Sequence, residues 1–311
     1  MALPKPISDE FLQQLARDAR THFGRGRVAR YIPALAEVRP DQFGLAICYR
    51  DGRLQTAGDA HTGFSSQSIS KVLALVMAMR STDVRKLWQR VRQEPSGMAF
   101  ASLVQLESEN GIPRNPFVNA GALVVVDILC DAQFLVLHRM REFARALCDD
   151  PTIGYDVRVA RSELDNTARN AAIGWLLKSF GNLNGRVERV LEVYCHFCAL
   201  HMSCAQLARC CNFLCNGGVN ATTGERLLTR EQARRVNGLM LTCGLYDASG
   251  TYAAQVGLPS KSGVGGGLLA VLPGEFTVCA WSPALDSLGN SIVASWALER
   301  LVEHIGRSPL G

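Results

Sequence analysis

Lysine is scarce in this chain of 311 residues, since 28 of its 33 basic side chains are arginine and only five are lysine. The basic residues outnumber the 28 acidic ones by five, and they are scattered along the sequence. A nucleic-acid-binding surface normally gathers its basic residues on one face, with aromatic residues between them. The sequence therefore predicts no nucleic-acid partner.

Long apolar runs are also missing. None approaches the roughly 18 residues that a membrane-spanning helix requires. The first twenty residues, MALPKPISDEFLQQLARDAR, lack the apolar segment of a signal peptide. With 48% hydrophobic and 20% charged residues, the chain has enough apolar side chains to bury a core. We expect a globular cytoplasmic protein without a membrane partner.

Cysteine, by contrast, is abundant: there are eleven, and six of them lie between Cys195 and Cys215. Cys195 and Cys198 enclose His196, and His201 is close by, so a metal site must be considered. A structural zinc site needs two ligand pairs on loops that converge, whereas this segment predicts a continuous apolar helix. We favour packed, reduced thiols and expect no metal, and we keep a cysteine-based metal site as the weaker alternative.

Strand patterns lie towards both ends of the chain. FGLAICYRDGRLQTAGD predicts two strands that turn at Asp51-Gly52, and GLLAVL with FTVCAWS predicts a second hairpin that turns at Pro273-Gly274. Residues 8–20 predict an amphipathic helix capped by Ser8, and NSIVASWALERLVEHI predicts another capped by Asn290.

Between the two hairpins the sequence is mostly helical, and its clearest segments are QSISKVLALVMAMR, NAGALVVVDILCD and ARNAAIGWLLKSF. Strands at both ends with helices between them do not fit a repeated βαβ pattern. We expect an α+β fold whose antiparallel sheet is assembled from both ends of the chain. Residues 1–66 with 247–311 would form an α/β sheet domain and 67–246 a mainly helical domain, with the active site between them.

The usual motifs of nucleotide, hydrolase and zinc-protease sites are absent: there is no P-loop, no G-x-S-x-G and no H-E-x-x-H. The five lysines give a single S-x-x-K, formed by Ser68 and Lys71 at the start of an apolar helix. This spacing places the two side chains on one helix face, and burial can lower a lysine pKa to ~7–8, where it acts as a general base. The alternative is a serine near a helix start with an ordinary lysine one turn later.

A second element lies late in the chain, where Lys261, Ser262 and Gly263 lead into Val264 and three glycines. Glycine lets a backbone or a carboxylate approach closely, and Lys261 would supply positive charge. A flexible glycine turn is the alternative. S-x-x-K followed by a distant K-S-G is the arrangement of serine β-lactamases and penicillin-binding enzymes, so the pair favours an active-serine hydrolase.

The sequence resembles the serine-dependent glutaminases, in their short bacterial form, which share the β-lactamase-like fold. The matching segments extend from Tyr31 to Ser291 and include YIPALA, TAGD, QSISKV, EPSG, NPFVNAGA, SELDNTARN, LEVYC, CGLYDASG and VGLPSKSGVGGG. So many matches in one order are far more specific than either three-residue motif alone.

The resemblance implies a catalytic apparatus for L-glutamine. Ser68 would attack the side-chain amide, giving a γ-glutamyl ester and ammonia. Lys71 would take the serine proton, with Tyr246 helping to relay it to the leaving nitrogen. The backbone N–H groups of Ser68 and Val264 would form the oxyanion hole. Neither a metal nor an organic cofactor is implied, and a dimer or tetramer is.

The resemblance also implies that Tyr31, Asn119, Glu163, Asn170 and Tyr194 hold the substrate. Glu163 would bind its ammonium group, while Tyr31 and Asn119 would bind its carboxylate. Each of the five residues also has an alternative role that needs no ligand. The alternatives are core tyrosines for Tyr31 and Tyr194, a helix cap for Asn119, a surface acid for Glu163 and a polar helix face for Asn170. A zwitterionic ligand does require one buried anion and several neutral donors.

Two other functions share some of these features. A β-lactamase-like peptidase or esterase would use the same S-x-x-K and K-S-G motifs. A non-catalytic amino-acid-binding protein could keep the fold and the substrate residues, although the intact Ser68 and Lys71 pair argues against it.

Overall fold

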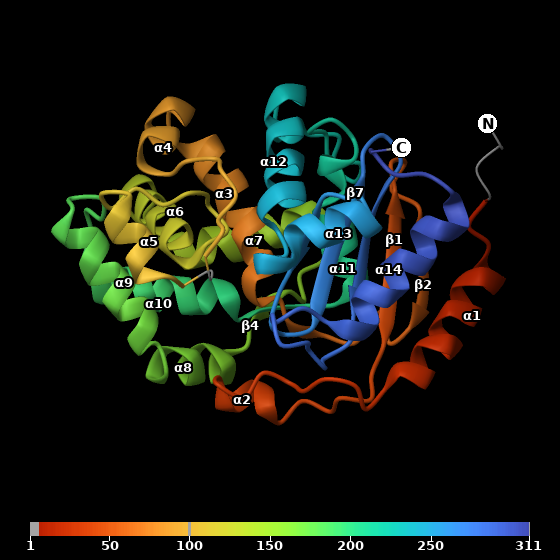
Figure 1. Ribbon diagram of the computed structural model, residues 1–311. Coiled ribbons are helices and arrows are strands. Elements are labelled where there is room, and N and C mark those ends of the chain that lie inside the picture. Colours follow the sequence, from red (N-terminus) through yellow and green to blue (C-terminus); the bar gives the residue numbers. More distant parts are fainter. Residues whose placement is uncertain (1–5, 99–100, 311) are drawn as a thin grey trace.

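The computed structural model describes residues 6–98 and 101–310 (Figure 1). The helices are α1 Asp9–Ala19, α2 Pro33–Ala36, α3 Ser70–Ser81, α4 Val84–Arg90, α5 Leu103–Ser108, α6 Asn119–Ala132, α7 Val136–Cys148, α8 Val157–Asp165, α9 Ala168–Ser179, α10 Val187–Cys198, α11 Cys204–Cys210, α12 Arg230–Cys243, α13 Ser249–Gln255 and α14 Ile292–Ile305. The strands are β1 Gly44–Tyr49, β2 Leu54–Gly58, β3 Phe64–Ser65, β4 Gly154–Tyr155, β5 Leu200–Met202, β6 Ser260–Ser262, β7 Gly267–Leu272 and β8 Phe276–Trp281. Short 3₁₀ turns are η1 Arg20–His22, η2 Gln67–Ile69, η3 Asn212–Leu214 and η4 Tyr246–Ala248.

An antiparallel sheet of five strands joins the two ends of the chain, in the order β2-β1-β8-β7-β6. Both predicted hairpins are present, and Gly52 and Gly274 occupy their turns with φ of +88° each. This left-handed conformation favours glycine because a side chain would be strained there. The pairing of β1 with β8 confirms that the sheet is assembled from both ends of the sequence.

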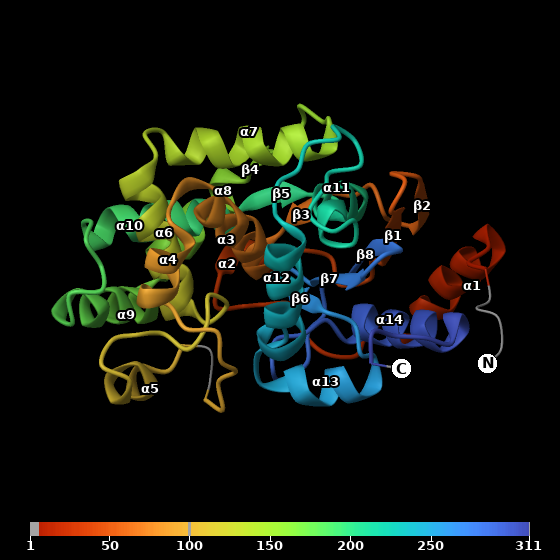
Figure 2. The ribbon, with the colours of Figure 1, turned by 90° about the horizontal axis from the view of Figure 1, so that it is seen from above.

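Both faces of the sheet are buried, and alternate residues of β1 serve different cores. Leu45 and Ile47 pack with apolar residues of α1, α13 and α14, which lie over one face of the sheet in Figures 1 and 2. Ala46 and Cys48 point to the other face and join the large core of the helical part. This alternation follows from the two-residue period of a strand.

The helical part packs around α6, whose residues 119–129 are all buried, with α3, α9 and α10 against it. A second sheet of three short strands, in the order β3-β5-β4, lies in this region. No sequence pattern predicted this second sheet.

The cysteine-rich segment is not the continuous helix that the sequence predicted. Helix α10 ends at Cys198 because the next residues form β5 and pair with β3 and β4. A new helix, α11, then begins at a capping box in which Ser203 and Gln206 satisfy each other's backbone N–H groups.

The two predicted end-helix caps have different outcomes. The Ser8 hydroxyl accepts a hydrogen bond from the Phe11 N–H at 3.1 Å, as predicted. The prediction for α14 is wrong by one residue, since Ser291 caps the helix through the Ala294 N–H. Asn290 is instead buried with its amide towards the Leu245 carbonyl.

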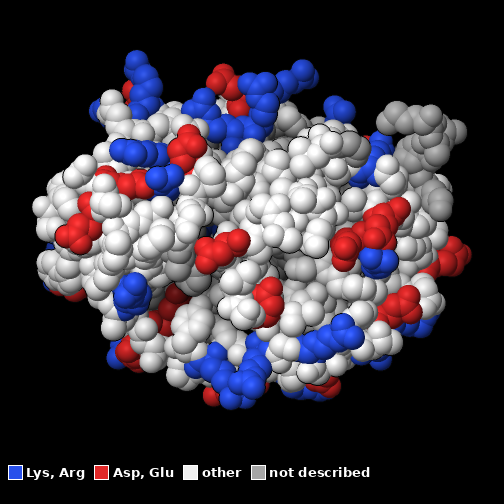
Figure 3. Space-filling model, in the orientation of Figure 1, with Lys and Arg blue, Asp and Glu red and all other residues white. Residues whose placement is uncertain are grey.

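Among the described residues, no single helix is long and apolar enough to cross a membrane. Taken together, α6 and α7 have the length and apolar composition of a membrane span, but the two helices are bent by 101° at the break between them. On the face drawn in Figure 3, acidic and basic side chains are interspersed around a largely uncharged central area.

Candidate active site

Ser68 lies in the 3₁₀ turn η2, directly before α3, and is buried. The preceding residue, Gln67, adopts a left-handed φ of +48°, which turns the chain sharply after β3. The Gln67 carbonyl accepts a hydrogen bond from the Ser70 hydroxyl at 2.8 Å. These contacts fix Ser68 at the N-terminal end of α3, where the helix dipole favours negative charge.

Lys71 is the second residue of α3 and is buried. Its Nζ donates to the Asn119 Oδ1 at 2.8 Å and to the Phe117 carbonyl at 3.1 Å. Burial lowers the pKa of Lys71 to about 8, although the nearby Cys198 and Glu163 oppose the shift. A lysine with this pKa is partly neutral near pH 8 and can accept a proton.

Tyr246 opens the 3₁₀ turn η4, with a left-handed φ of +52°. Burial raises its pKa to about 12, while hydrogen bonds between its hydroxyl and the Ser68 and Ser262 side chains act in the opposite direction. The phenol therefore lies close to the predicted nucleophile.

Gly263 brings the segment after β6 against the turn of Ser68. A Cβ atom at Gly263 would lie 2.5 Å from the Ser66 carbonyl oxygen and 3.3 Å from the Ser68 nitrogen. Only glycine fits this approach. The backbone at Gly263 therefore lies against that of Ser66 and Ser68, and Val264 follows directly in the chain.

The side chains of Asn119, Asn170 and Tyr194 form one network with Lys71. The Asn119 amide nitrogen donates to the Asn170 Oδ1 at 2.8 Å, and the Tyr194 hydroxyl donates to the Asn119 Oδ1 at 3.4 Å. The Lys71 Nζ also lies 5.8 Å from the centre of the Tyr194 ring. Asn119 has no capping bond on α6, whose cap residue is Val118, so its side chain is committed to this network.

Glu163 is buried near the end of α8 and is not a surface acid. The Gln67 side-chain nitrogen donates to its Oε2 at 3.4 Å and to the Ser65 hydroxyl at 2.9 Å. Burial raises the pKa of Glu163 to about 7, against hydrogen bonds from Gln67 and Cys198 and the charge of Lys71. A carboxylate held this way can pair with a cationic ligand group.

Tyr31 is 59% exposed, whereas the other predicted site residues are buried or half-buried. Partial burial of its hydroxyl raises its pKa, and the neighbouring Tyr246 and Glu163 add to the shift. Tyr31 thus lies at the surface beside the site, near Tyr246 and Glu163.

Two further residues touch this site, and no sequence pattern predicted them. Gln67 links Glu163 to Ser65, and the buried Cys198 lies close enough to Glu163 and Tyr194 to affect their pKa values. A buried amide directly before the serine was the available signal for Gln67. Cys198 gave none, because its partners are distant in sequence.

Lys261 has other neighbours than the sequence suggested. Its side chain is fully buried, and its Nζ donates to the carbonyls of Gly244 at 2.9 Å and Ser262 at 2.8 Å. The amine thus hydrogen-bonds with the protein backbone in this structure. Ser262, also buried, contacts Tyr246 and Gly244.

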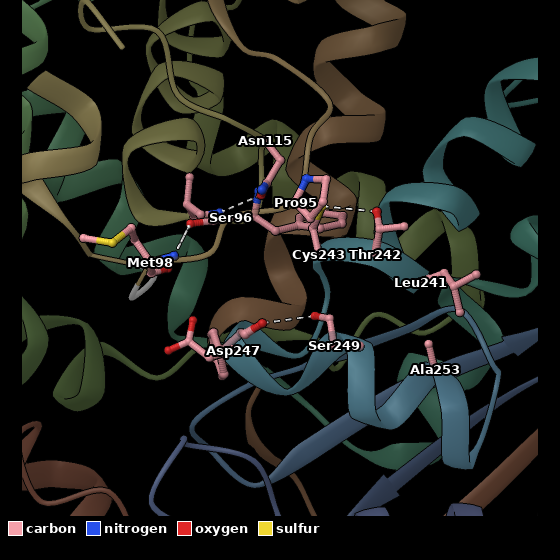
Figure 4. Close-up of a pocket in the computed structure, with 14 residues that line it drawn as sticks. Pro95, Ser96, Met98, Asn115, Leu241, Thr242, Cys243, Asp247, Ser249 and Ala253 are labelled. Carbon is pink, nitrogen blue, oxygen red and sulfur yellow. Dashed lines mark hydrogen bonds between the residues drawn. The ribbon is translucent and has the colours of Figure 1, made fainter. Parts of the chain in front are cut away.

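A cavity of about 350 Å³ opens beside Tyr246 and Phe117 (Figure 4). Pro95, Ser96, Met98 and Asn115 line one side of it, and the chain around Asp247 lines the other. The cavity therefore meets the site where Tyr246 and the Phe117–Lys71 hydrogen bond lie.

All eleven cysteines lie in the described part of the chain and are free, and nine of them are buried. This packing agrees with the predicted reduced thiols. Within residues 6–98 and 101–310, no group of three or more histidine, cysteine or acidic residues is placed to hold a metal ion. The alternative of a cysteine-based metal site gains no support here.

Comparisons with known proteins place this architecture in a family. A sequence model of the family Glutaminase matches residues 26–309. The glutaminase of Photorhabdus laumondii is 52% identical over 302 residues, which cover 97% of this chain and 98% of the relative. A solved probable glutaminase, ybaS, has a TM-score of 0.89 at 33% identity and covers 97% of this chain and 99% of its own.

Another solved relative is Mglu in its L-glutamate-binding form, with a TM-score of 0.91 at 35% identity, covering 97% of this chain and 69% of that one. The fold and its relatives define a hydrolase of the β-lactamase-like class that acts on amide C–N bonds. The chain belongs to the glutaminase family.

Proposed function

We propose that the protein hydrolyses L-glutamine to L-glutamate and ammonia through a γ-glutamyl ester on Ser68. The observation that carries the proposal is the setting of Ser68, whose side chain lies close to the Tyr246 phenol. One helical turn further on lies the buried Lys71, whose pKa is lowered to about 8.

In the first half of the reaction the Ser68 oxygen attacks the side-chain amide carbon of glutamine. The serine proton passes to Lys71 through Tyr246, while the backbone N–H groups of Ser68 and Val264 stabilise the oxyanion. Lys71 then returns this proton through Tyr246 to the amide nitrogen, the C–N bond breaks, ammonia leaves, and Lys71 is neutral again. In the second half, water attacks the ester, Lys71 takes its proton, and glutamate leaves as Ser68 is reprotonated.

Substrate recognition is assigned to the polar groups around the pair. Glu163 binds the α-ammonium as a buried anion, and Tyr31 with Asn119 binds the α-carboxylate. Asn170 and Tyr194 hold Asn119 in place through the network described above. A relative, Mglu, has been solved with L-glutamate, which supports a product-sized pocket in this fold.

Three broader features belong to the same proposal. Residues 1–66 with 247–311 act as the sheet domain and residues 67–246 as the helical domain, with the site between them. The protein works in the cytoplasm, where its buried thiols stay reduced. It assembles as a homodimer or homotetramer and needs no cofactor.

The test is ammonia release from L-glutamine and L-asparagine by the purified protein. The proposal expects turnover of glutamine and little of asparagine, whose chain is one methylene shorter. Labelling of Ser68 by a fluorescent penicillin without glutamine turnover would instead support a β-lactamase-like peptidase or esterase. Glutamine binding by calorimetry without turnover would support a non-catalytic binding protein.

A further inference from the structure

The turn that carries Tyr246 is strained and therefore must be held by its surroundings. Helix α12 ends at Cys243, Gly244 follows as its cap, and Tyr246 then adopts a φ of +52°. A non-glycine residue in this conformation costs on the order of 1–3 kcal/mol unless neighbouring contacts fix it. The position of the phenol depends on what anchors this short segment.

The anchor is the carbonyl of Gly244, which lies against β6. It accepts hydrogen bonds from the Lys261 Nζ at 2.9 Å, from the Ser262 backbone N–H at 3.2 Å and from the Ser262 hydroxyl at 3.4 Å. A side chain at Gly244 would overlap the Ser260 carbonyl. The turn and the strand are therefore in direct backbone contact.

Lys261 joins this anchor to the Tyr246 ring. Its Nζ also donates to the Ser262 carbonyl at 2.8 Å, and it lies 4.7 Å from the centre of the Tyr246 ring and 5.7 Å from that of Phe117. One amine thus contacts the turn, the strand and the face of the phenol.

Stability alone does not account for this residue. A fully buried lysine is costly, and among the described residues its polar partners are two carbonyls and no carboxylate. Burial and the charge of Lys71 lower its pKa well below the usual value. A neutral amine still has two N–H donors for the two carbonyls, so the arrangement persists in either protonation state.

We propose that Lys261 is a positioning residue, which holds Tyr246 at the nucleophile by binding the Gly244 carbonyl and covering the phenol ring. The inference rests on the proposed function, because it takes Tyr246 as the proton relay of Ser68. It also replaces the expectation that Lys261 presents positive charge to the substrate.

A double-mutant cycle tests the proposal, with Lys261→Met, Tyr246→Phe and the double variant assayed for glutamine hydrolysis. Loss of a group that transfers a proton typically lowers the reaction rate by ~10²–10⁴-fold. We expect Lys261→Met to lower kcat by ~10- to 100-fold while KM changes less than about threefold. The double variant should be no slower than Tyr246→Phe alone, because both changes remove the same function.

Lys178→Met is the matched control. The Lys178 Nζ also donates to two carbonyls, those of Asn184 at 2.7 Å and Gly185 at 2.9 Å, but it lies at the surface. Wild-type kcat and KM are expected for it. Melting temperatures of all variants separate loss of fold from loss of position.

Several outcomes would overturn the proposal. Effects on kcat that multiply in the double variant would show that Lys261 acts independently of Tyr246. A rise in KM with kcat unchanged would indicate that Lys261 binds the substrate and does not position Tyr246. If Lys261→Met does not fold, Lys261→Gln keeps an N–H₂ donor and is assayed in its place, and failure of both to fold would make Lys261 a stability residue.

The proposed function is judged separately, by Ser68→Ala. Wild-type rates in Ser68→Ala would contradict the Ser68 mechanism itself. Loss of activity in Ser68→Ala together with unchanged kcat in Tyr246→Phe would contradict only the relay and the role of Lys261.

Discussion

Lys71 and Glu163 are the two buried groups of the site whose pKa values approach neutrality, about 8 and about 7. Glu163 must be ionised to bind an ammonium group, and Lys71 must be neutral to accept a proton. Both conditions are lost as the pH falls. We therefore expect kcat/KM for glutamine to rise between pH 6 and pH 8.5, and Glu163→Gln to remove the lower of the two ionisations and raise KM. A profile that is flat or falls over this range would contradict these roles.

Asn119 offers a direct way to move the ionisation of Lys71. Its Oδ1 accepts from the Lys71 Nζ at 2.8 Å, so Asn119→Asp would place a negative charge there with almost no change in shape. An adjacent opposite charge stabilises the protonated amine by ~1–3 pKa units. The pH at which kcat rises should therefore increase by ~1–3 units. An unshifted profile would show that Lys71 is not the group being titrated.

The residues of the site differ in how far the sequence could predict them. Ser68 and Lys71 share one helix turn, so their spacing alone predicts proximity. Asn119 contacts Lys71 across 48 positions and Asn170 across 51, and such long-range contacts have no local pattern. These residues came from the family resemblance, and Gln67, which neither route singled out, became visible only through its bonds to Glu163 and Ser65.

At the scale of elements, the site depends on the close approach of β6 to the turn before α3. Gly263→Ala would place a Cβ 2.5 Å from the Ser66 carbonyl and push the Val264 N–H away from that of Ser68. Loss of one oxyanion-hole donor costs ~10²–10³-fold in kcat, and we expect a decrease of that order in ammonia release.

Gly238→Ala in α12 is the control for this change. A Cβ there meets no atom within 4 Å, and alanine is favoured over glycine inside a helix by roughly 0.5–1 kcal/mol. It should keep wild-type kcat with equal or higher stability. If Gly263→Ala also keeps wild-type kcat, the β6 turn does not build the oxyanion hole.

Element prediction succeeded where the pattern is long or the turn is distinctive. The long apolar runs of α3 and α6 predict buried helices, and the Asp51-Gly52 turn predicts a hairpin. The three-stranded sheet escaped prediction because β3 and β4 have two residues each and β5 has three. Such strands are too short to show an alternation of apolar and polar residues. They form because they pair with segments that are distant in the sequence.

At the scale of the whole molecule, the exposed aromatic residues bear on assembly. Phe134 and Trp175 are 85% and 54% exposed, and large exposed apolar side chains are more common at interfaces than on free surfaces. We expect light scattering after size exclusion to give a dimer or tetramer of the 33.8 kDa chain. A monomer mass throughout the micromolar range would contradict the proposed assembly.

The chain folds back so that its two ends share one sheet, and this closure brings Tyr246 and the β6 turn to Ser68. Ser68 and Tyr246 are 178 residues apart in the sequence, so the proposed mechanism depends on this closure. A local change at Ser68 should leave that closure intact, because its hydroxyl is small and lies in a short turn.

The most direct measurement is the initial rate of ammonia release from L-glutamine by Ser68→Ala, beside the wild type, with folding checked by melting temperature. We expect the rate to fall by at least ~10³-fold, since Ser68 is the proposed nucleophile. A folded Ser68→Ala variant that releases ammonia at a rate near that of the wild type would contradict it.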